Sequence, residues 1–351
     1  MEKIIDPVSL SLIEAELTPE KILCNTNKGG NVLYVVDAHD SPNVMQEIGR
    51  LREISFREGG GGSGLAADID SFDTMEVPYK QLLVWDPDAK SILGGYRYIL
   101  GPDVKIDDQG QPILATAHMF HFSDLFIQEY LPHTMELGRS FVTPDYQSSR
   151  AGSKALYALD NLWDGIAAVA EEHPGIIYFF GKMTMYPSYD RASRDLILHF
   201  LWKHFPDPEE LVRPKKPVLP TTSASLMDLI LKDSEYKDDY RNLKDAVRKL
   251  GTNIPPLVNS YMNASPSMKM LGTAINDEFS DVEETGIMIC YSEMYPDKRD
   301  RHITAALAEW TRKVRKRFPR ISNETMEKLK SLRFSRKNVV FERFKRKRNK
   351  S

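Results

Sequence analysis

The sequence predicts an α/β (α+β) fold in which helices flank a mixed, mostly antiparallel sheet. Apolar runs of strand length recur along the chain, and between them lie longer segments whose apolar residues repeat every three or four positions. With 351 residues, of which 41% are hydrophobic and 28% charged, the chain can bury one large core or two smaller ones. These proportions are typical of a globular protein.

Strands and helices are placed by apolar periodicity and by the turn residues at their ends. The run over 176–181 is apolar enough for a strand buried on both faces. The strands over 79–86 and 91–100 are joined by a short Pro-Asp turn, which predicts a hairpin. In chain order we expect a strand over 32–37, a helix over 41–58, strands over 79–86, 91–100 and 135–142, a helix over 154–172, a strand over 176–181, helices over 189–204 and 236–250, strands over 254–262 and 286–291, and a helix over 302–318.

Two unusual segments interrupt these elements. Five glycines in six positions at 59–64 cannot hold a regular element, so they predict a mobile lid or a loop that admits substrate. Five prolines between 205 and 222 indicate a boundary or a long surface excursion. We therefore expect a core over 1–204, an extension over 205–302, and a basic helix with a tail over 303–351.

The net charge of −3 hides a strong polarity along the chain. Residues 311–351 carry 17 Lys and Arg against three Glu, a net charge of +14. Phe341 and Phe344 are interleaved with the last cations. Such a segment is typical of binding to an anionic lipid surface, at roughly 1 kcal/mol per cation, and of binding to nucleic acid or to an acidic protein. The remaining alternative is a solvated tail with no partner. The composition leaves these alternatives open.

Several classes of protein are disfavoured. No apolar run approaches the roughly 20 residues that span a bilayer, and the first residues lack a signal-peptide pattern, so we expect a cytoplasmic protein. Cys24 and Cys290 are too few for a disulfide framework. His118 and His121 have a metal-ligand spacing without further ligands, and no metal is expected. Hydrolase and dinucleotide-binding glycine motifs are absent.

The segment 135–153 carries the strongest functional signal. Glu136 and Arg139 lie three positions apart in a predicted strand, so they point to opposite faces unless a bulge re-aims one of them. A structural salt bridge is the simplest alternative. The residues from Arg150 to Ser153 then open a helix, where free backbone N–H groups favour an anionic group such as phosphate. A carboxylate in front of such a loop is where a general base would meet a group-transfer donor.

A second acidic cluster precedes the predicted hairpin. Asp68, Asp70 and Asp73 lie at near-alternate positions, but the Gly and the distal Glu of a calcium-binding EF-hand loop are missing. The remaining alternatives are a site that orients an amine and simple capping of a helix or turn. The spacing alone does not decide between them.

Together these residues resemble a known family. They are Arg52 with Phe56, Asp70 with Asp73, Gly94-Gly95-Tyr96-Arg97 at a strand end, Glu136-Leu137-Gly138-Arg139-Ser140-Phe141-Val142 with Pro144 and Tyr146, and Leu162-Trp163 with Gly165-Ile166-Ala167. This set is similar to the acyl carrier protein-dependent branch of the GNAT (Gcn5-related N-acyltransferase) superfamily, above all to the ornithine-lipid and glycine-lipid N-acyltransferases, often labelled hemolysin-like. Its order is shared with acyl-homoserine lactone synthases. The resemblance covers 50–189 well and 253–302 more loosely.

The resemblance implies a reaction. A fatty acyl group, in particular a 3-hydroxyacyl group, would pass from the phosphopantetheine of acyl carrier protein to the amine of a small amino acid, glycine or ornithine, in the first step of aminolipid synthesis. The neutral amine would attack the thioester directly, with no acyl-enzyme and no bound cofactor. The basic tail would also reach an anionic inner membrane face. No nucleic acid would be bound. The alternatives are an acyl-homoserine lactone-type signal synthase, which needs S-adenosylmethionine, and a non-enzymatic membrane-active protein.

The resemblance also assigns roles to residues of this chain. Glu136 would be the base or the amine-orienting carboxylate, and strands 135–142 and 176–181 would splay apart to admit the pantetheine arm. The phosphate loop is shorter than the superfamily pattern, which favours a carrier-protein donor over coenzyme A. Residues 205–302 would complete the acyl and substrate site. The implied catalytic residues are Glu136, Asp70, Asp73 and Arg139, the substrate-binding residues are Arg52, Phe56, Arg97 and Phe141, and the phosphopantetheine-binding residues are Val142, Arg150, Gly152 and Ser153.

Overall fold

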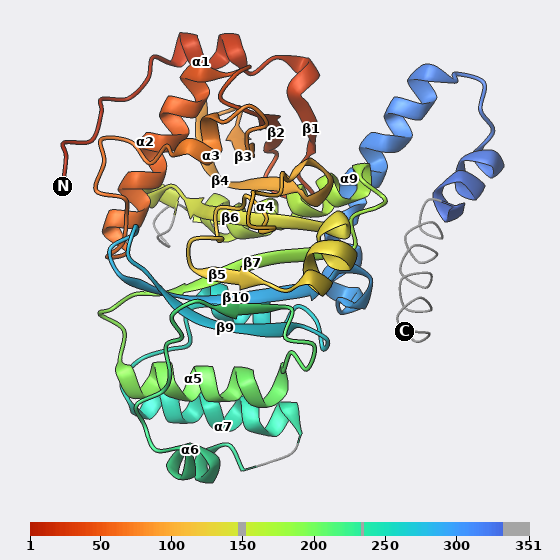
Figure 1. The fold of residues 1–351 in the computed structure, drawn as a ribbon. Helices are drawn as coiled ribbons and strands as arrows, with labels where there is room; N and C mark the ends of the chain where they lie inside the picture. The colour runs from red at the N-terminus through yellow and green to blue at the C-terminus, as the bar shows by residue number, and fades with distance from the viewer. Residues whose placement is uncertain (147–151, 233–234, 333–351) are drawn as a thin grey trace.

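A computed structural model describes residues 1–146, 152–232 and 235–332 (Figure 1). Its strands are β1 (Ile22–Asn25), β2 (Val32–Val36), β3 (Lys80–Asp86), β4 (Ser91–Leu100), β6 (Thr134–Val142), β7 (Tyr178–Met185), β9 (Lys269–Asn276) and β10 (Val282–Cys290), with β5 (Phe120–Phe122) and β8 (Val212–Pro214) paired separately. The main sheet has eight strands in the order β1-β2-β3-β4-β6-β7-β10-β9. Its neighbouring pairs are antiparallel except for β6 with β7. The predicted fold class is therefore confirmed.

The parallel pair β6 and β7 separates after a short contact. The two backbones pair only where Thr134, Met135 and Glu136 lie beside residues 178–180. Further along, β6 stays paired with β4 and β7 with β10, so the two strands diverge and leave a gap in the middle of the sheet. The splay expected for these two strands is present.

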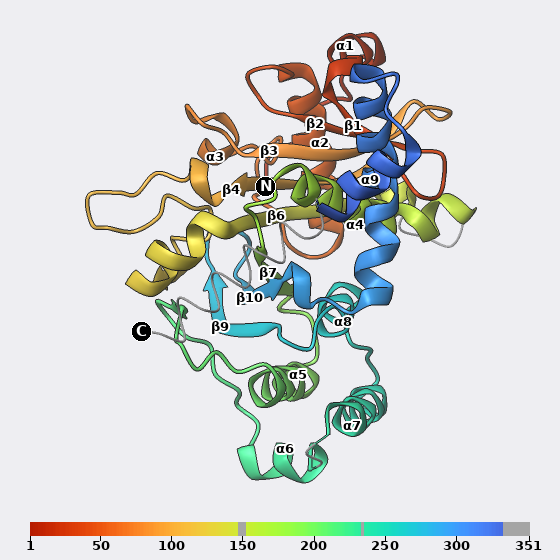
Figure 2. The same cartoon turned by 90° about the vertical axis from the view of Figure 1, so that its right-hand side faces the viewer.

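Helices cover both faces of the sheet. They are α1 (Leu10–Glu16), α2 (Pro42–Glu58), α3 (Ser71–Thr74), α4 (Gly152–Glu172), α5 (Arg191–His204), α6 (Ala224–Ile230), α7 (Tyr236–Lys249), α8 (Pro256–Met262) and α9 (Pro296–Arg317). Neighbouring residues of β3 show the two faces, because Leu82 packs in one cluster with Leu162 of α4 while Leu83 packs in another with Ile48 of α2. Figure 2 shows α1 and α6 at opposite ends of the molecule. No helix in the described ranges is long and apolar enough to cross a membrane.

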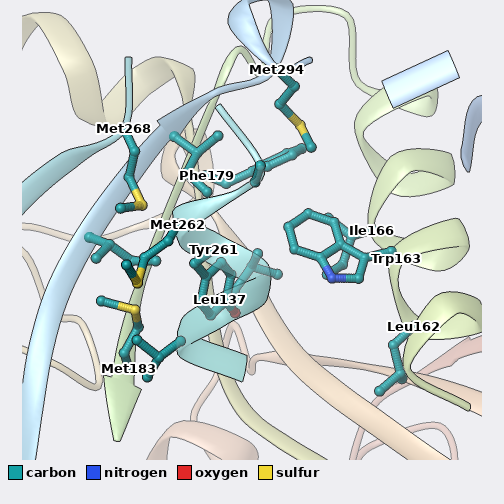
Figure 3. Packing of buried hydrophobic residues seen from close by; sticks show 14 of the residues in the cluster. Leu137, Leu162, Trp163, Ile166, Phe179, Met183, Tyr261, Met262, Met268 and Met294 are labelled. Carbon is teal, nitrogen blue, oxygen red and sulfur yellow. The ribbon is translucent and has the colours of Figure 1, made fainter. Parts of the chain in front are cut away.

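One predicted element is wrong. Where a strand was predicted over 254–262, residues 256–262 form the helix α8. Pro256 occupies the first turn of α8, where its missing N–H costs nothing because that position has no intrahelical acceptor. Figure 3 shows Tyr261 of α8 packed beside Leu137 of β6 and near Trp163, whose ring centroid lies 5.9 Å from that of Tyr261. The helix therefore forms one border of the gap between β6 and β7.

The segment that follows residue 204 completes the same sheet. β10 pairs with β7 along its whole length, and β9 pairs with β10 at the edge. Strand β9 was not predicted, because its burial does not alternate regularly along 269–276. Helix α9 begins at Pro296, earlier than the expected start at 302, and packs on α4. The last part of the predicted basic tail, 333–351, lies outside the described residues.

Candidate active site

Two cavities meet where β6 and β7 diverge. We call the smaller one, of about 110 Å³, the acidic cavity, because Glu136 and Asp70 line it together with Arg97. The larger one, of about 250 Å³, is the gap cavity, which reaches from Tyr96 and Tyr261 to Phe56. The residues that line both are Leu137, Gly138, Arg139, Lys182 and Phe279. The two cavities are therefore adjacent across the open part of the sheet.

Glu136 is buried in the wall of the acidic cavity, with 3% of its surface exposed. The hydroxyl of Thr116 donates a hydrogen bond to its Oε1 at 2.7 Å, and the hydroxyl of Tyr79 donates to its Oε2. The Tyr79 hydroxyl accepts in turn from the backbone N–H of Ala115 at 2.9 Å. Burial raises the pKa of Glu136, and these hydrogen bonds and nearby cations oppose the rise without cancelling it. A carboxylate with a raised pKa that faces a cavity is a candidate general base.

A β-bulge brings Arg139 to the same cavity as Glu136. Around Tyr96 of β4, the ladder with β6 shifts by one residue, so Arg139 and Ser140 both lie opposite one position. Arg139 has a φ of 49°, a left-handed conformation that is uncommon for a residue with a side chain. Strict alternation would separate Glu136 from Arg139, and the bulge re-aims the arginine. Arg139 pairs with Asp68 at 2.8 Å instead of forming the salt bridge that the spacing suggested.

A buried ion-pair network supports the cavity wall. Nη1 of Arg97 lies 2.8 and 2.7 Å from the two carboxylate oxygens of Asp70 and 3.2 Å from Asp73. Nη1 of Arg52 lies 3.3 Å from both oxygens of Asp73. Burial alone would raise the pKa of Asp73, but the charges of Arg52 and Arg97 outweigh burial and hold that pKa well below its ordinary value. Asp73 is therefore an ionised, fully paired group.

Asp70 and Asp73 also cap helix α3. The side chain of Asp70 accepts from the backbone N–H groups of Phe72 and Asp73, while the side chain of Asp73 accepts from the backbone N–H of Asp70. Capping and ion pairing therefore occur together. Asp73 is fully buried, whereas the side chain of Asp70 is 30% exposed and lines the acidic cavity. Asp70 can touch a ligand, and Asp73 can act only through Arg97.

Arg97, which lines the acidic cavity, has a buried donor without a partner among the described residues. Its Nη1 is held by the aspartates, but its buried Nε has no hydrogen-bond partner among the described residues. That nitrogen lies beside Gly138, and the guanidinium lies 5.2 Å from the centre of the Tyr79 ring. An unsatisfied buried donor costs about 1–3 kcal/mol.

Lys182 occupies the junction of the two cavities, and the sequence did not single it out. It pairs with the buried Glu284 of β10, whose other oxygen accepts from the hydroxyl of Thr184 at 2.7 Å. Burial lowers the pKa of Lys182, and Glu284 opposes that effect. Tyr79 and Thr116, the two partners of Glu136, were also missed. No local pattern marks these three residues, because their partners at the site lie far away along the chain.

The predicted substrate-binding residues fall into two groups. Arg97 lines the acidic cavity and Phe56 lines the gap cavity. Arg52 and Phe141, which are both described and buried, line neither cavity. Arg52 holds Asp73 and Gln81, while Phe141 packs in the cluster that joins the sheet to α2. These two side chains lie one layer behind the cavities.

The predicted phosphopantetheine residues lie after the bulge. The carbonyl of Val142, at the end of β6, accepts a hydrogen bond from the hydroxyl of Ser55 at 3.2 Å. Gly152 and Ser153 begin α4, the helix that follows β6. Arg150 lies outside the described residues. A phosphate at this helix start stays a prediction.

The glycine-rich segment 59–64 is tied to the structure on both sides. The carboxylate of Glu53 accepts from the N–H of Ser63 at 3.0 Å, from the hydroxyl of Ser63 at 2.8 Å and from the N–H of Gly64 at 2.8 Å. The carbonyl of Gly62 accepts from the hydroxyl of Ser280 at 2.9 Å. The segment predicted as a mobile lid is thus an anchored loop beside the gap cavity.

His118 and His121, the two histidines with a metal-ligand spacing, lie in different surroundings. His118 lies at the rim of the acidic cavity, with its ring nitrogens 3.0 Å from the Ala115 carbonyl and 3.1 Å from Oδ1 of Asn276. His121 is exposed on β5. Among the described residues, no group of three or more His, Cys, Asp or Glu is arranged to hold a metal ion.

The largest cavity near the site does not contain this chemistry. It has a volume of about 670 Å³ and lies between α4, α7, α8 and α9. Its lining mixes acids, cations and aromatic rings, and it reaches the gap cavity only at Pro256. The candidate active site is therefore identified by chemistry and not by cavity size. The acidic and gap cavities contain Glu136 and Lys182, whose pKa values are shifted, and Arg97, which has an unpartnered buried donor among the described residues.

Comparison with known proteins supplies the family. Residues 51–156 match the acetyltransferase (GNAT) domain. The chain is 62% identical over 304 residues to the glycine N(alpha)-acyltransferase of Bacteroides thetaiotaomicron, an alignment that covers 86% of this chain and 90% of that protein. The chain belongs to this family of GNAT N-acyltransferases. A protein with the same name from Phocaeicola vulgatus is 59% identical over 303 residues, covering 86% of this chain and 93% of its own.

The family resemblance inferred from the motifs is thereby confirmed, and the chain is an N-acyltransferase. Among solved structures, a CoA-dependent acyl-homoserine lactone synthase, BjaI, with SAM and isopentyl-CoA, aligns with 79% of this chain and 90% of its own. The sequence identity is 13% and the TM-score 0.34, so this similarity carries no argument about function.

For an N-acyltransferase that uses Glu136 as its base, activity must depend on pH. Because burial raises the pKa of Glu136, we expect kcat/KM to fall as the pH is lowered through a pKa above the ordinary value for Glu. The hydrogen bond from Thr116 lowers that pKa, so Thr116→Val should move the acidic limb of the profile to higher pH. Profiles of kcat/KM against pH for both proteins measure the shift. Identical acidic limbs would show that Glu136 is not the titrating group.

Proposed function

We propose that this chain transfers a fatty acyl group from the phosphopantetheine arm of acyl carrier protein to the amine of glycine. The observation that carries the proposal is the junction of the acidic cavity with the gap between β6 and β7, which would bring an amine on one side to a thioester on the other. The two relatives named glycine N(alpha)-acyltransferase support glycine over ornithine as the acceptor. The small volume of the acidic cavity, about 110 Å³, supports the same choice.

The acidic cavity offers separate groups to the two ends of an amino acid. Glu136 would receive the amine, and Arg97 would receive the carboxylate. Asp70 and Asp73 hold Nη1 of Arg97 and would keep its guanidinium from turning away. Fixing both ends of the acceptor aims its nitrogen at one point, and such positioning supplies a large part of the rate of a bimolecular reaction.

The gap would hold the thioester. Beyond Glu136, the facing edges of β6 and β7 are not paired with each other over the described strands. Backbone N–H groups on these edges can polarise the thioester carbonyl, and the charge of Lys182 lies beside them. Tyr96 and Tyr261, whose hydroxyls are 3.2 Å apart, line the same cavity on the α8 side. The pantetheine arm would pass along these groups.

The proposed step balances without a cofactor. The neutral amine nitrogen attacks the thioester carbonyl carbon and forms the C–N bond, and collapse of the tetrahedral intermediate breaks the C–S bond. Glu136 takes a proton from the attacking nitrogen, and the leaving sulfur takes up a proton to become the pantetheine thiol. The product is an N-acyl amino acid, the first intermediate of an aminolipid. No side chain becomes acylated in this scheme.

The acyl donor is the part of the proposal that rests on the family resemblance. A 3-hydroxyacyl carrier protein would be used in preference to an acyl coenzyme A, because the phosphate loop is short. Purified protein would be incubated with 3-hydroxyacyl carrier protein or the matching acyl coenzyme A, and with glycine or ornithine, and the products identified by mass spectrometry. N-(3-hydroxyacyl)glycine formed from the carrier-protein donor is the expected product. Equal rates with the acyl coenzyme A donor would contradict the preference for carrier protein. Acylation of ornithine alone would contradict glycine as the acceptor.

We also infer a cytoplasmic enzyme that is peripheral on an anionic membrane face. The described end of α9 is basic, with Arg315, Lys316 and Arg317 in its last turn, and Phe318 after it is exposed. Deleting 341–351 removes six further cations, so binding to vesicles that contain anionic lipid should weaken strongly, at roughly 1 kcal/mol per cation. Co-sedimentation measures it, with neutral vesicles as the control. Unchanged vesicle binding with a raised KM for acyl carrier protein would assign the tail to the donor.

A further inference from the structure

We propose that Phe279 limits the size of the amino acid that this enzyme accepts, and that the glycine-rich loop 59–64 holds this ring in place from behind. The inference rests on the proposed function, because it concerns the acceptor of the same reaction. It also gives a structural role to the loop that the sequence made conspicuous.

Phe279 is a wall shared by the two cavities. It is 4% exposed and lines both the acidic cavity and the gap cavity. On one side its ring packs edge to face against Phe56, with centroids 5.1 Å apart and planes at 75°. On the other side the guanidinium of Arg139 lies 4.6 Å from the ring centre. A ring held by two such contacts has little freedom to move away from a larger ligand.

The turn that carries Phe279 is bound to the glycine-rich loop. Phe279 lies between β9 and β10, and its backbone N–H donates to the carbonyl of Asn276 at 3.2 Å. Ser280 and Asp281 follow with φ angles of 58° and 54°. The Ser280 hydroxyl donates to the carbonyl of Gly62 at 2.9 Å. Turn and loop are therefore one connected unit.

Glycine is needed in the loop for space. A Cβ on Gly61 would lie 2.9 Å from the Tyr186 ring and 3.1 Å from the Phe279 ring. A Cβ on Gly59 would lie 2.8 Å from the Tyr186 hydroxyl. Neither position has a positive φ, so the backbone itself would accept alanine. The loop thus lies against the two rings, and any side chain at Gly61 would press Phe279 toward the cavities.

Phe279 is also the wall that can be changed without disturbing the base. The acidic cavity is also lined by the rings of Tyr79 and Phe72, whose centroids lie 5.8 Å apart, and the Tyr79 hydroxyl is hydrogen-bonded to Glu136. Phe279 has no hydrogen-bonding role toward Glu136. One misplaced methylene in a fitted pocket changes kcat/KM by roughly 10- to 200-fold. A side chain on the acceptor amino acid would clash with the Phe279 ring and lower kcat/KM by a factor of this size.

The test compares Phe279→Ala with wild type and with Ile275→Ala, a control on the same hairpin whose side chain is 49% exposed. kcat/KM is measured for glycine and for L-alanine with one acyl donor. We expect the alanine-to-glycine ratio to rise by about tenfold or more in Phe279→Ala and to stay unchanged in Ile275→Ala. Gly61→Ala should act in the opposite direction, raising the KM for glycine. An unchanged ratio in Phe279→Ala overturns the inference.

The controls separate this inference from the proposed function. Wild type that does not acylate glycine contradicts the proposed function, whereas wild type that acylates glycine with an unchanged ratio in the variant contradicts only the role of Phe279. Calorimetric binding of glycine and L-alanine gives the same ratio without turnover. If Phe279→Ala does not fold, as judged by circular dichroism, Phe279→Leu is the second variant. It removes less of the side chain and should shift the alanine-to-glycine ratio in the same direction.

Discussion

Replacing Glu136 by Gln is expected to lower kcat by roughly 10²- to 10⁴-fold, the contribution of a positioned general base. Gln has nearly the same shape and keeps an oxygen that can accept from Tyr79 or Thr116, but it cannot take a proton from the amine. The folded state should therefore survive while the chemical step is lost. Because the loss lies in the proton transfer, the KM for the amino acid should change much less than kcat.

Single-turnover rates with a saturating acyl donor measure this effect directly, and circular dichroism reports the fold. Glu76→Gln is a matched control, because Glu76 is an exposed acid that pairs with Lys105 and lines neither cavity. It should keep the wild-type rate. A Glu136→Gln protein that is folded and turns over at the wild-type rate would show that Glu136 is not the base.

Replacing Asp73 by Ala is expected to lower the free energy of unfolding by about 3–5 kcal/mol, because it leaves two buried guanidinium groups without their shared partner. Arg52 and Arg97 both contact this carboxylate, and both side chains are buried. The pKa of Asp73 is held low by the same pair, so the carboxylate is ionised wherever the protein is folded at neutral pH. Urea denaturation followed by fluorescence measures the change.

Asp70→Ala is the informative comparison for this prediction. Asp70 pairs with Arg97 as well, but its side chain is 30% exposed, so water can take its place and the loss should be smaller. Asp73→Ala should also raise the KM for the amino acid by releasing Arg97. Equal free energies of unfolding for wild type and Asp73→Ala would mean that the buried network adds nothing to stability.

The candidate site was predictable where its residues form a local motif. Asp70 with Asp73 and Glu136 with Arg139 stand at fixed spacings, and the structure brings all four to one region. The side chains that were not predicted are those whose role depends on a partner far away along the chain. Tyr79 and Thr116 donate hydrogen bonds to Glu136 although they lie 57 and 20 residues away along the chain. Lys182 pairs with Glu284, which lies 102 residues away.

The splay of β6 and β7 was expected from the family resemblance. By itself the sequence determined the order of most elements and the motif of the family. These features depend on periodicity, turn residues and short spacings, which act within a few residues. Tertiary structure alone decided that 256–262 is a helix, that a bulge turns Arg139 toward the cavity of Glu136, and that the glycine-rich loop lies against Phe279. Each of these outcomes depends on packing between distant segments, and no local pattern records it.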